Sequence, residues 1–271
     1  MSRISQTIAS KLAQGKKVLI PYIVAGDPSL ELTVPLMHAL VTSGADIIEL
    51  GMPFSDPSSD GPVIQLGAER ALRAGSNLKH IFAMVREFRE QDKDTPILLM
   101  GYLNPIESMG YETFAAEVKT AGADGLLIVD LPTAECEEFF AAVHAKGLDT
   151  IFLVAPTTNE TRLESICKHT SGWLYYVSLK GVTGAAILDN GEIRAKIEHL
   201  RTLTDLPIIV GFGIKDAASA RDMAAISDGV IVGSALVEKI GLLQADMRYS
   251  NAELNATVGV IGEIRSAIDA L

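Results

Sequence analysis

The chain has 271 residues, of which 48% are hydrophobic and 21% are charged, so it can bury a large core. Its formal net charge of −11 argues against binding to the phosphate backbone of nucleic acids, which needs clustered Lys and Arg. The two cysteines, Cys136 and Cys167, lack CxxC partners, which argues against a disulfide framework or a structural zinc site.

Residues 1–17, MSRISQTIASKLAQGKK, have the spacing of an amphipathic helix. They lack the uninterrupted apolar core of a signal peptide. No later segment reaches the roughly 18 consecutive apolar residues of a membrane span. The sequence therefore predicts a cytoplasmic protein that does not enter a membrane.

Eight short apolar runs follow, separated by stretches with helical spacing such as 29–44 and 133–147. The runs are VLIPYIVAG (18–26), DIIELG (46–51), PILLMG (96–101), GLLIVD (125–130), TIFLVAP (150–156), WLYYVSLKG (173–181), PIIVGFG (207–213) and GVIVGS (229–234). Runs that are apolar on both faces are typical of strands in a parallel sheet. Their alternation with helices predicts repeated βα units.

A phrase is repeated at three of these strands. SGADIIELG (43–51), AGADGLLIVD (121–130) and AISDGVIVGS (225–234) share a small residue, an Asp and an apolar run in the same order. Gly44 and Gly122 stand where a helix C-cap belongs, and the Asp then opens the strand. The repeat supports one βα unit recurring along the chain.

Eight βα units predict a (β/α)8 barrel. An open doubly wound sheet is the alternative, but it normally has fewer strands and often a glycine-rich first βα turn. The first turn here, VAGDPS at 24–29, is not a GxGxxG motif. Because no linker or break in composition is visible, residues 1–271 are predicted to form a single domain.

The stretch ELGMPFSDPSSDGP, at 49–62, begins at the end of the second predicted strand and continues into the loop after it. Catalytic residues of such barrels lie at the carboxyl ends of strands. Side chains alternate along a strand, so if Ile48 and Leu50 pack on the helices, Glu49 points into the barrel mouth. Partial loss of water there raises the pKa of a carboxyl toward the range useful for proton transfer at neutral pH. A Glu paired with Lys or Arg for structural reasons is the alternative.

Two further acids lie in the same stretch. Asp60 stands directly before Gly61-Pro62, so it is either a second functional carboxylate or the N-cap of the next helix. Asp56 is equally compatible with a turn residue.

Glycines after the seventh and eighth strands predict a phosphate site, because backbone N–H groups and a helix N-terminus must approach the anion closely. The candidates are Gly211 and Gly213 in the first loop, Gly233 and Ser234 in the second, and Gly184 as a third wall. Plain turn glycines are the alternative.

The other strand ends are mainly apolar or aromatic, which suits a flat apolar group and also ordinary barrel packing. They carry Tyr22, Met100, Tyr102, Leu127, Phe152 and Tyr175, with Phe212 beside the phosphate loop. None of the five histidines falls at a strand end, which argues against a His-ligated metal or a His-based triad.

Several of these phrases resemble the tryptophan synthase alpha subunit. They are ELGMPFSDPSSDGPVIQ (49–65), GYLNPI (101–106), LLIVDLP (126–132), GVTGA (181–185), VGFGI (210–214) and VGSAL (232–236). The similarity extends almost end to end. It implies a TIM barrel with an extra N-terminal helix and additional short helices. It also implies a carbon–carbon lyase of tryptophan biosynthesis that cleaves indole-3-glycerol phosphate to indole and glyceraldehyde 3-phosphate.

The resemblance also implies roles for single residues. Glu49 becomes the acid/base, Asp60 the carboxylate that faces the indole nitrogen, and Thr183 a partner of Asp60 when its loop closes. The indole and glycerol groups are expected to contact Tyr22, Met100, Tyr102, Leu127, Tyr175 and Thr183. The phosphate is expected to contact Gly184, Phe212, Gly213, Gly233 and Ser234.

The family works as an alpha2beta2 complex, in which the beta subunit receives indole through a channel and carries pyridoxal phosphate. The resemblance therefore implies a beta partner and no metal or cofactor on this chain. Pro53, Asp56, Asn104 and Pro132 are the expected docking residues.

The segment SLKGVTG, at 178–184, departs from the family, where smaller or Arg-containing residues are expected before GVTG. Lys180 follows the sixth strand, where a Schiff-base lysine could lie. Another phosphate-binding barrel lyase or aldolase, or a stand-alone indole-releasing lyase, is therefore the alternative function.

Overall fold

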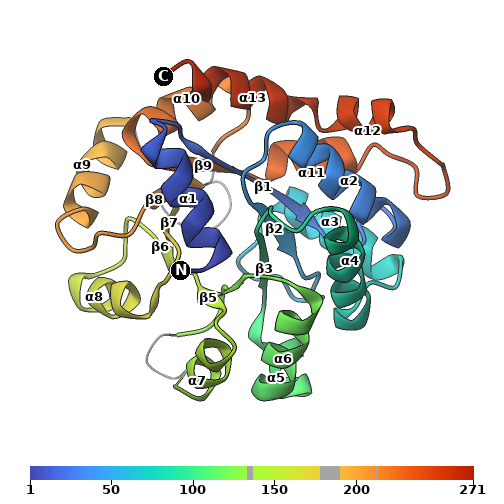
Figure 1. Ribbon diagram of the computed structural model, residues 1–271, viewed down its shortest axis with the longest axis horizontal. Helices are drawn as coiled ribbons and strands as arrows, with labels where there is room; N and C mark the ends of the chain where they lie inside the picture. The colour runs from blue at the N-terminus through green and yellow to red at the C-terminus, as the bar shows by residue number, and fades with distance from the viewer. Residues whose placement is uncertain (133–136, 178–189, 212) are drawn as a thin grey trace.

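The computed structural model describes residues 1–132, 137–177, 190–211 and 213–271. In these residues nine parallel strands form one sheet, in the order β5-β4-β3-β2-β1-β9-β8-β7-β6. The strands occupy the centre of Figure 1 and the helices surround them. This arrangement confirms the predicted barrel.

The strands are short and are connected by helices throughout. They are β1 (Val18–Val24), β2 (Ile48–Gly51), β3 (Ile97–Gly101), β4 (Gly125–Ile128), β5 (Asp149–Thr150), β6 (Leu153–Val154), β7 (Leu174–Val177), β8 (Ile208–Gly211) and β9 (Gly229–Val232). The helices are α1 (Arg3–Ala13), α2 (Leu30–Thr42), α3 (Pro62–Arg73), α4 (Leu78–Gln91), α5 (Leu103–Met109), α6 (Tyr111–Ala121), α7 (Glu137–Ala145), α8 (Glu160–His169), α9 (Asn190–Leu200), α10 (Ala217–Ile226), α11 (Ser234–Ile240), α12 (Asn251–Thr257) and α13 (Gly259–Asp269). Over the described residues, none of these helices has the length and apolarity needed to cross a membrane.

The prediction of one continuous fifth strand at 150–156 is wrong, because the structure has two short strands there, β5 and β6. β5 pairs with β4, and β6 pairs with β7. Between them, the Ile151 N–H donates to the Leu126 carbonyl at 2.9 Å and the Phe152 carbonyl accepts from the Tyr175 N–H at 3.2 Å. One segment therefore contacts both ends of the sheet and closes the barrel.

Alternation along the strands separates two cores. Ile48 and Leu50 of β2 belong to the outer cluster, between the sheet and the helices. Ile47 belongs to the inner cluster, which fills the barrel, as the alternation predicts. Ile4 and Ile8 of α1 pack on that inner cluster, so α1 covers the amino end of the barrel. The carboxyl end is thereby left as the end available to a ligand.

The repeated Asp has a structural role at the amino ends of the strands. Asp46 accepts a hydrogen bond from the Leu19 N–H at 2.9 Å, and Asp124 accepts one from the Ile97 N–H at 2.8 Å. The aspartate of the third phrase does the same for the first residue of β8. Each Asp thus pairs a backbone donor of the neighbouring strand.

The predicted helix ends at Gly44 and Gly122 are confirmed. Their φ angles are +98° and +99°, in the left-handed region that glycine adopts without steric cost. These turns direct the chain from α2 and α6 into the strands that follow.

Candidate active site

Glu49 lies inside the barrel and is fully buried. On β2 it is in register with Tyr22 of β1 and Leu98 of β3, so its side chain shares the inner face with theirs. Among the described residues, neither carboxylate oxygen of Glu49 has a hydrogen-bond partner. An ion pair with Lys or Arg, the structural alternative from the sequence, is therefore not formed within the described part of the chain.

The environment of Glu49 favours its neutral form. Burial, followed by the nearby charge of Asp60, raises the pKa of Glu49 from 4.5 to about 8. At neutral pH the group is therefore mainly protonated, and it can give up a proton without leaving the useful pH range.

This burial has a measurable effect on stability. Between about pH 4.5 and pH 8 the unfolded chain carries Glu49 ionised while the folded chain keeps it protonated, so the free energy of unfolding decreases as pH rises. Glu49→Gln removes this titration. Relative to the parent, the variant is expected to gain roughly 2–4 kcal/mol of unfolding free energy on going from pH 5 to pH 8. Urea unfolding of the variant and the parent at both pH values measures this gain. If the variant and the parent differ in unfolding free energy by the same amount at pH 5 and at pH 8, the assigned pKa is wrong.

Asp60 lies on the loop between β2 and α3 and is partly buried. The N-cap of α3 is Gly61 and Pro62 begins the helix, so the interpretation of Asp60 as the N-cap is wrong. Instead, the backbone carbonyl of Asp60 accepts a hydrogen bond from Gln65 Nε2 at 2.8 Å. The carboxylate of Asp60 therefore does not cap the amino end of α3.

The pKa of Asp60 is raised less than that of Glu49. Burial raises the pKa of Asp60 from 3.8 to about 6, and a hydrogen bond from the Tyr102 hydroxyl acts in the opposite direction. Asp60 is thus mainly ionised at neutral pH while Glu49 is mainly protonated. Two neighbouring carboxyl groups whose environments separate their pKa values are the arrangement expected of an acid and an electrostatic partner.

Two tyrosines lie against glycines at the strand ends. A Cβ added to Gly51 would lie 2.2 Å from the Tyr22 hydroxyl, and one added to Gly211 would lie 2.5 Å from the Tyr175 hydroxyl. These glycines therefore give the phenol rings the space they occupy. Both glycines were visible in the sequence. The ring that packs on each one comes from the neighbouring strand and could not be read from the sequence.

Both phenols remain protonated near neutral pH. Burial is the main cause that raises the pKa of Tyr22, followed by Asp60 and Glu49. Burial and then Glu49 raise the pKa of Tyr175. Both hydroxyls therefore lie near the two carboxyl groups as potential hydrogen-bond donors.

The apolar candidates lie beside these groups. Met100 on β3 is in register with Gly51 on one side and with Leu127 on the other. Tyr102 follows β3 and is 5% exposed. The structure thus brings Tyr22, Met100, Tyr102, Leu127 and Tyr175 to one region of the barrel, around Glu49.

The described phosphate candidates follow two adjacent strands, β8 and β9. Gly213 is exposed and has a φ of +77°, which favours glycine. Gly233 precedes α11, which has no capping side chain, and Ser234 is exposed. A Cβ on Gly233 would lie 3.8 Å from Tyr22, so this glycine adjoins the site of the carboxyl groups.

The expected docking residues lie after β2, β3 and β4: Pro53 and Asp56 on one loop, Asn104 in α5, and Pro132 beyond β4. Pro53 is partly exposed, and Asp56, Asn104 and Pro132 are exposed. The loops that follow β3 and β4 are joined by a 2.8 Å hydrogen bond from the Leu103 N–H to Asp130. The segments that carry Asn104 and Pro132 are thus held together.

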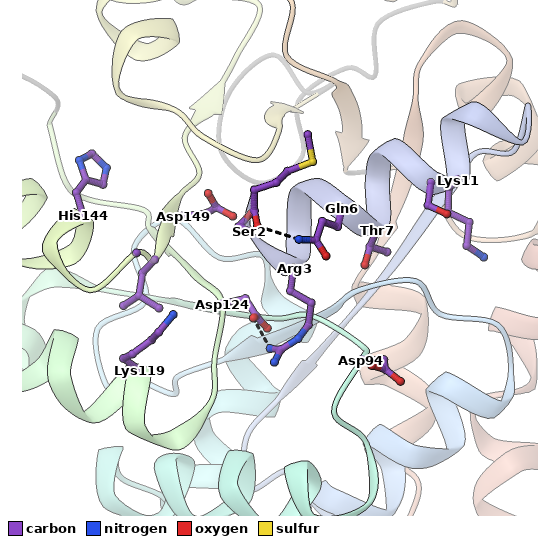
Figure 2. A pocket seen from close by; sticks show the side chains of 14 residues that line it. Ser2, Arg3, Gln6, Thr7, Lys11, Asp94, Lys119, Asp124, His144 and Asp149 are labelled. Carbon is purple, nitrogen blue, oxygen red and sulfur yellow. Dashed lines mark hydrogen bonds and ion pairs between the residues drawn. The ribbon is translucent and has the colours of Figure 1, made fainter.

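A polar hollow of about 900 Å3 lies at the opposite end of the barrel, beside α1 (Figure 2). Two of its cations are in ion pairs: Arg3 with Asp124, and Lys11 with Asp46 at 2.5 Å. These ion pairs fasten α1 to the amino ends of the strands. The hollow therefore contributes to attachment of the helix, and the candidate active site is at the carboxyl end.

Within the described residues, no three His, Cys, Asp or Glu side chains are grouped as a metal site. All five histidines lie in helices and none at a strand end: His38, His80, His144, His169 and His199. Five residues singled out from the sequence lie outside the described residues: Cys136, Lys180, Thr183, Gly184 and Phe212.

Comparison with known proteins identifies this arrangement. The family model described as "Tryptophan synthase alpha chain" matches residues 8–266. The chain belongs to the tryptophan synthase alpha chain family. A tryptophan synthase alpha chain from Marinobacter nauticus is 53% identical over 271 residues, covering 100% of this chain and 99% of the relative. One from Acinetobacter baumannii strain AYE is 51% identical, with both chains covered completely.

Solved structures agree with the family membership. The tryptophan synthase alpha subunit of Legionella pneumophila strain Paris is 44% identical, covers 100% of both chains and has a TM-score of 0.91. As a member of this family, the chain is a carbon–carbon lyase of tryptophan biosynthesis that cleaves indole-3-glycerol phosphate. The family also implies a beta-subunit partner.

Proposed function

We propose that Glu49 and Asp60 carry out the cleavage of indole-3-glycerol phosphate to indole and glyceraldehyde 3-phosphate. The main support is a fully buried Glu49 with no hydrogen-bond partner among the described residues, next to a second carboxylate. Glu49 is protonated and Asp60 ionised at neutral pH, and these are the states the two roles require.

The first step is transfer of the Glu49 proton to the indole carbon that carries the glycerol chain. The ring then bears positive charge on its nitrogen and can accept the electrons of the bond to be broken. The Asp60 carboxylate stabilises that charge, and it does so strongly because the site is partly shielded from water.

The second step breaks the carbon–carbon bond. The Glu49 carboxylate removes the proton of the hydroxyl next to the bond, the hydroxyl carbon becomes the aldehyde, and the bonding electrons return to the ring. One proton leaves Glu49 and one comes back, so the cycle closes without an external acid or base. Neither a metal nor a Schiff base takes part in these steps.

The remaining residues orient the substrate. Tyr22, Met100, Tyr102, Leu127 and Tyr175 surround the indole and glycerol groups, and Gly213, Gly233 and Ser234 bind the phosphate. Thr183, Gly184 and Phe212 keep the roles that the resemblance implies. No cofactor is expected on this chain.

The partner is the beta subunit, in an alpha2beta2 complex in which that subunit carries pyridoxal phosphate. Pro53, Asp56, Asn104 and Pro132 form the docking surface. Closure of the barrel mouth by the partner would keep indole from escaping. We place this complex in the cytoplasm, as the sequence predicts.

The purified chain should release indole and glyceraldehyde 3-phosphate from indole-3-glycerol phosphate in equal amounts, slowly alone and faster with the beta subunit. Indole release is measured by its absorbance change and the aldehyde by a coupled dehydrogenase. Absence of indole both with and without the partner would reject the proposed function. The aldolase alternative instead predicts a covalent adduct after borohydride treatment with a phosphorylated aldehyde.

A further inference from the structure

We propose that Tyr102 is a positioning residue that orients Asp60 and connects it to Phe54 on the docking loop, residues 53–60. The inference rests on the proposed role of Asp60. It assigns to Tyr102 a task beyond lining the indole site, and it gives the partner surface a physical route to a reacting group.

The hydroxyl of Tyr102 faces two consecutive residues of the loop, Ser59 and Asp60. The backbone N–H of Ser59 donates to the Tyr102 oxygen at 3.1 Å. A phenol has one proton, and accepting from Ser59 leaves that proton free to be donated elsewhere. The Ser59 contact places the hydroxyl beside Asp60, the next residue, and as a donor to that carboxylate it lowers the pKa of Asp60. Tyr102 therefore contacts both the loop backbone and the functional carboxylate.

Tyr102 is better fixed in position than the loop it contacts. It directly follows β3, is 5% exposed, and precedes Leu103, whose N–H is bonded to Asp130. The loop around Asp60 is largely exposed at Asp56 and Ser58. A donor on the barrel wall thus holds a carboxylate that a surface loop alone would leave free to reorient.

The same ring is in contact with the docking loop. Phe54 and Tyr102 are stacked, with ring centroids 5.4 Å apart and an interplanar angle of 29°. Phe54 is partly exposed and follows Pro53, an expected docking residue. A partner that presses on this loop displaces Phe54 against Tyr102, and any shift of the hydroxyl changes its bond to Asp60.

Tyr102→Phe tests the first part, because it removes the hydroxyl and keeps the ring. We expect kcat for indole release to fall about tenfold with little change in KM. The low-pH limb of kcat should move upward by about one pH unit, because a carboxylate that loses a hydrogen-bond donor is protonated more easily. Titration of the Asp60 carboxyl by 13C NMR should show the same upward shift without any substrate.

Tyr111→Phe is the matched control, since the Tyr111 hydroxyl also donates to a carboxylate, that of Glu107, at 3.0 Å on the surface. It should leave both the Asp60 titration and the pH profile unchanged. If Tyr102→Phe also leaves the Asp60 titration unchanged, the inference is wrong even when the parent cleaves the substrate normally. Failure of the parent to release indole would instead reject the proposed function.

Phe54→Leu tests the connection to the partner, because it removes the stacked ring and keeps an apolar side chain. With saturating beta subunit, the acceleration of indole release, taken as the ratio to the rate of the same variant alone, should fall at least about threefold. An unchanged acceleration at saturating partner would overturn the connection through Phe54.

Discussion

Glu49→Gln is expected to abolish turnover of indole-3-glycerol phosphate while leaving substrate binding largely intact. Both proton transfers pass through this one carboxyl, so its loss should reduce kcat by about 10^4 or more. Glutamine has nearly the same shape and is neutral, as protonated Glu49 is at neutral pH. Indole release measures kcat, and calorimetric titration with a non-cleavable indole alkyl phosphate measures the dissociation constant.

Glu117→Gln is a suitable control, because Glu117 is an exposed residue of α6. This variant should keep the kcat of the parent. Full kcat in Glu49→Gln would refute the acid/base assignment. A large loss of substrate binding in that variant would show that the Glu49 carboxyl mainly binds the substrate.

Asp60→Asn is expected to lower kcat by about 10^2 to 10^3 while the fold survives. Asparagine is similar in size but carries no charge, so it cannot stabilise the positive ring nitrogen in the transition state. Because Gly61 is the N-cap of α3, the substitution removes no helix cap. Steady-state kinetics and a thermal unfolding curve together separate the two effects.

Asp222→Asn, an exposed change on α10, serves as the control for loss of one negative charge. It should leave kcat and the melting temperature near those of the parent. Parent-like kcat in Asp60→Asn would show that Asp60 is structural after all. If the loss of kcat in Asp60→Asn is accounted for by the fraction of the variant that is unfolded, the electrostatic role of Asp60 is likewise rejected.

Much of the barrel could be predicted because its strands are buried on both faces and its helices lie between them. The alternation of Ile48, Glu49 and Leu50 was sufficient to aim Glu49 into the barrel. The division of the fifth strand was not predictable from 150–156, which is apolar after Thr150. It depends on the two neighbours that this segment contacts when the barrel closes, and those neighbours are distant in sequence.

The candidate site shows the same limit. The letters DGP permit Asp60 as an N-cap, and only the geometry of α3 assigns that position to Gly61. The need for glycine at 51 depends on the ring of Tyr22, which comes from a different strand. Tyr102 was predicted as a substrate contact, but its bond to Ser59 required the loop and β3 to be placed together.

The most direct test of the central claim is the pH dependence of indole release by the isolated chain, from about pH 5 to pH 10. Because Asp60 must be ionised and Glu49 protonated, the rate should rise through about pH 6 and fall through about pH 8. These limbs belong to the interacting pair, and the substrate phosphate also titrates near the lower one. In Asp60→Asn, the rise of the residual activity near pH 6 should therefore reflect only the titration of the substrate phosphate. A rate that stays level through pH 8 and above, with parent-like behaviour in Asp60→Asn, would contradict the account.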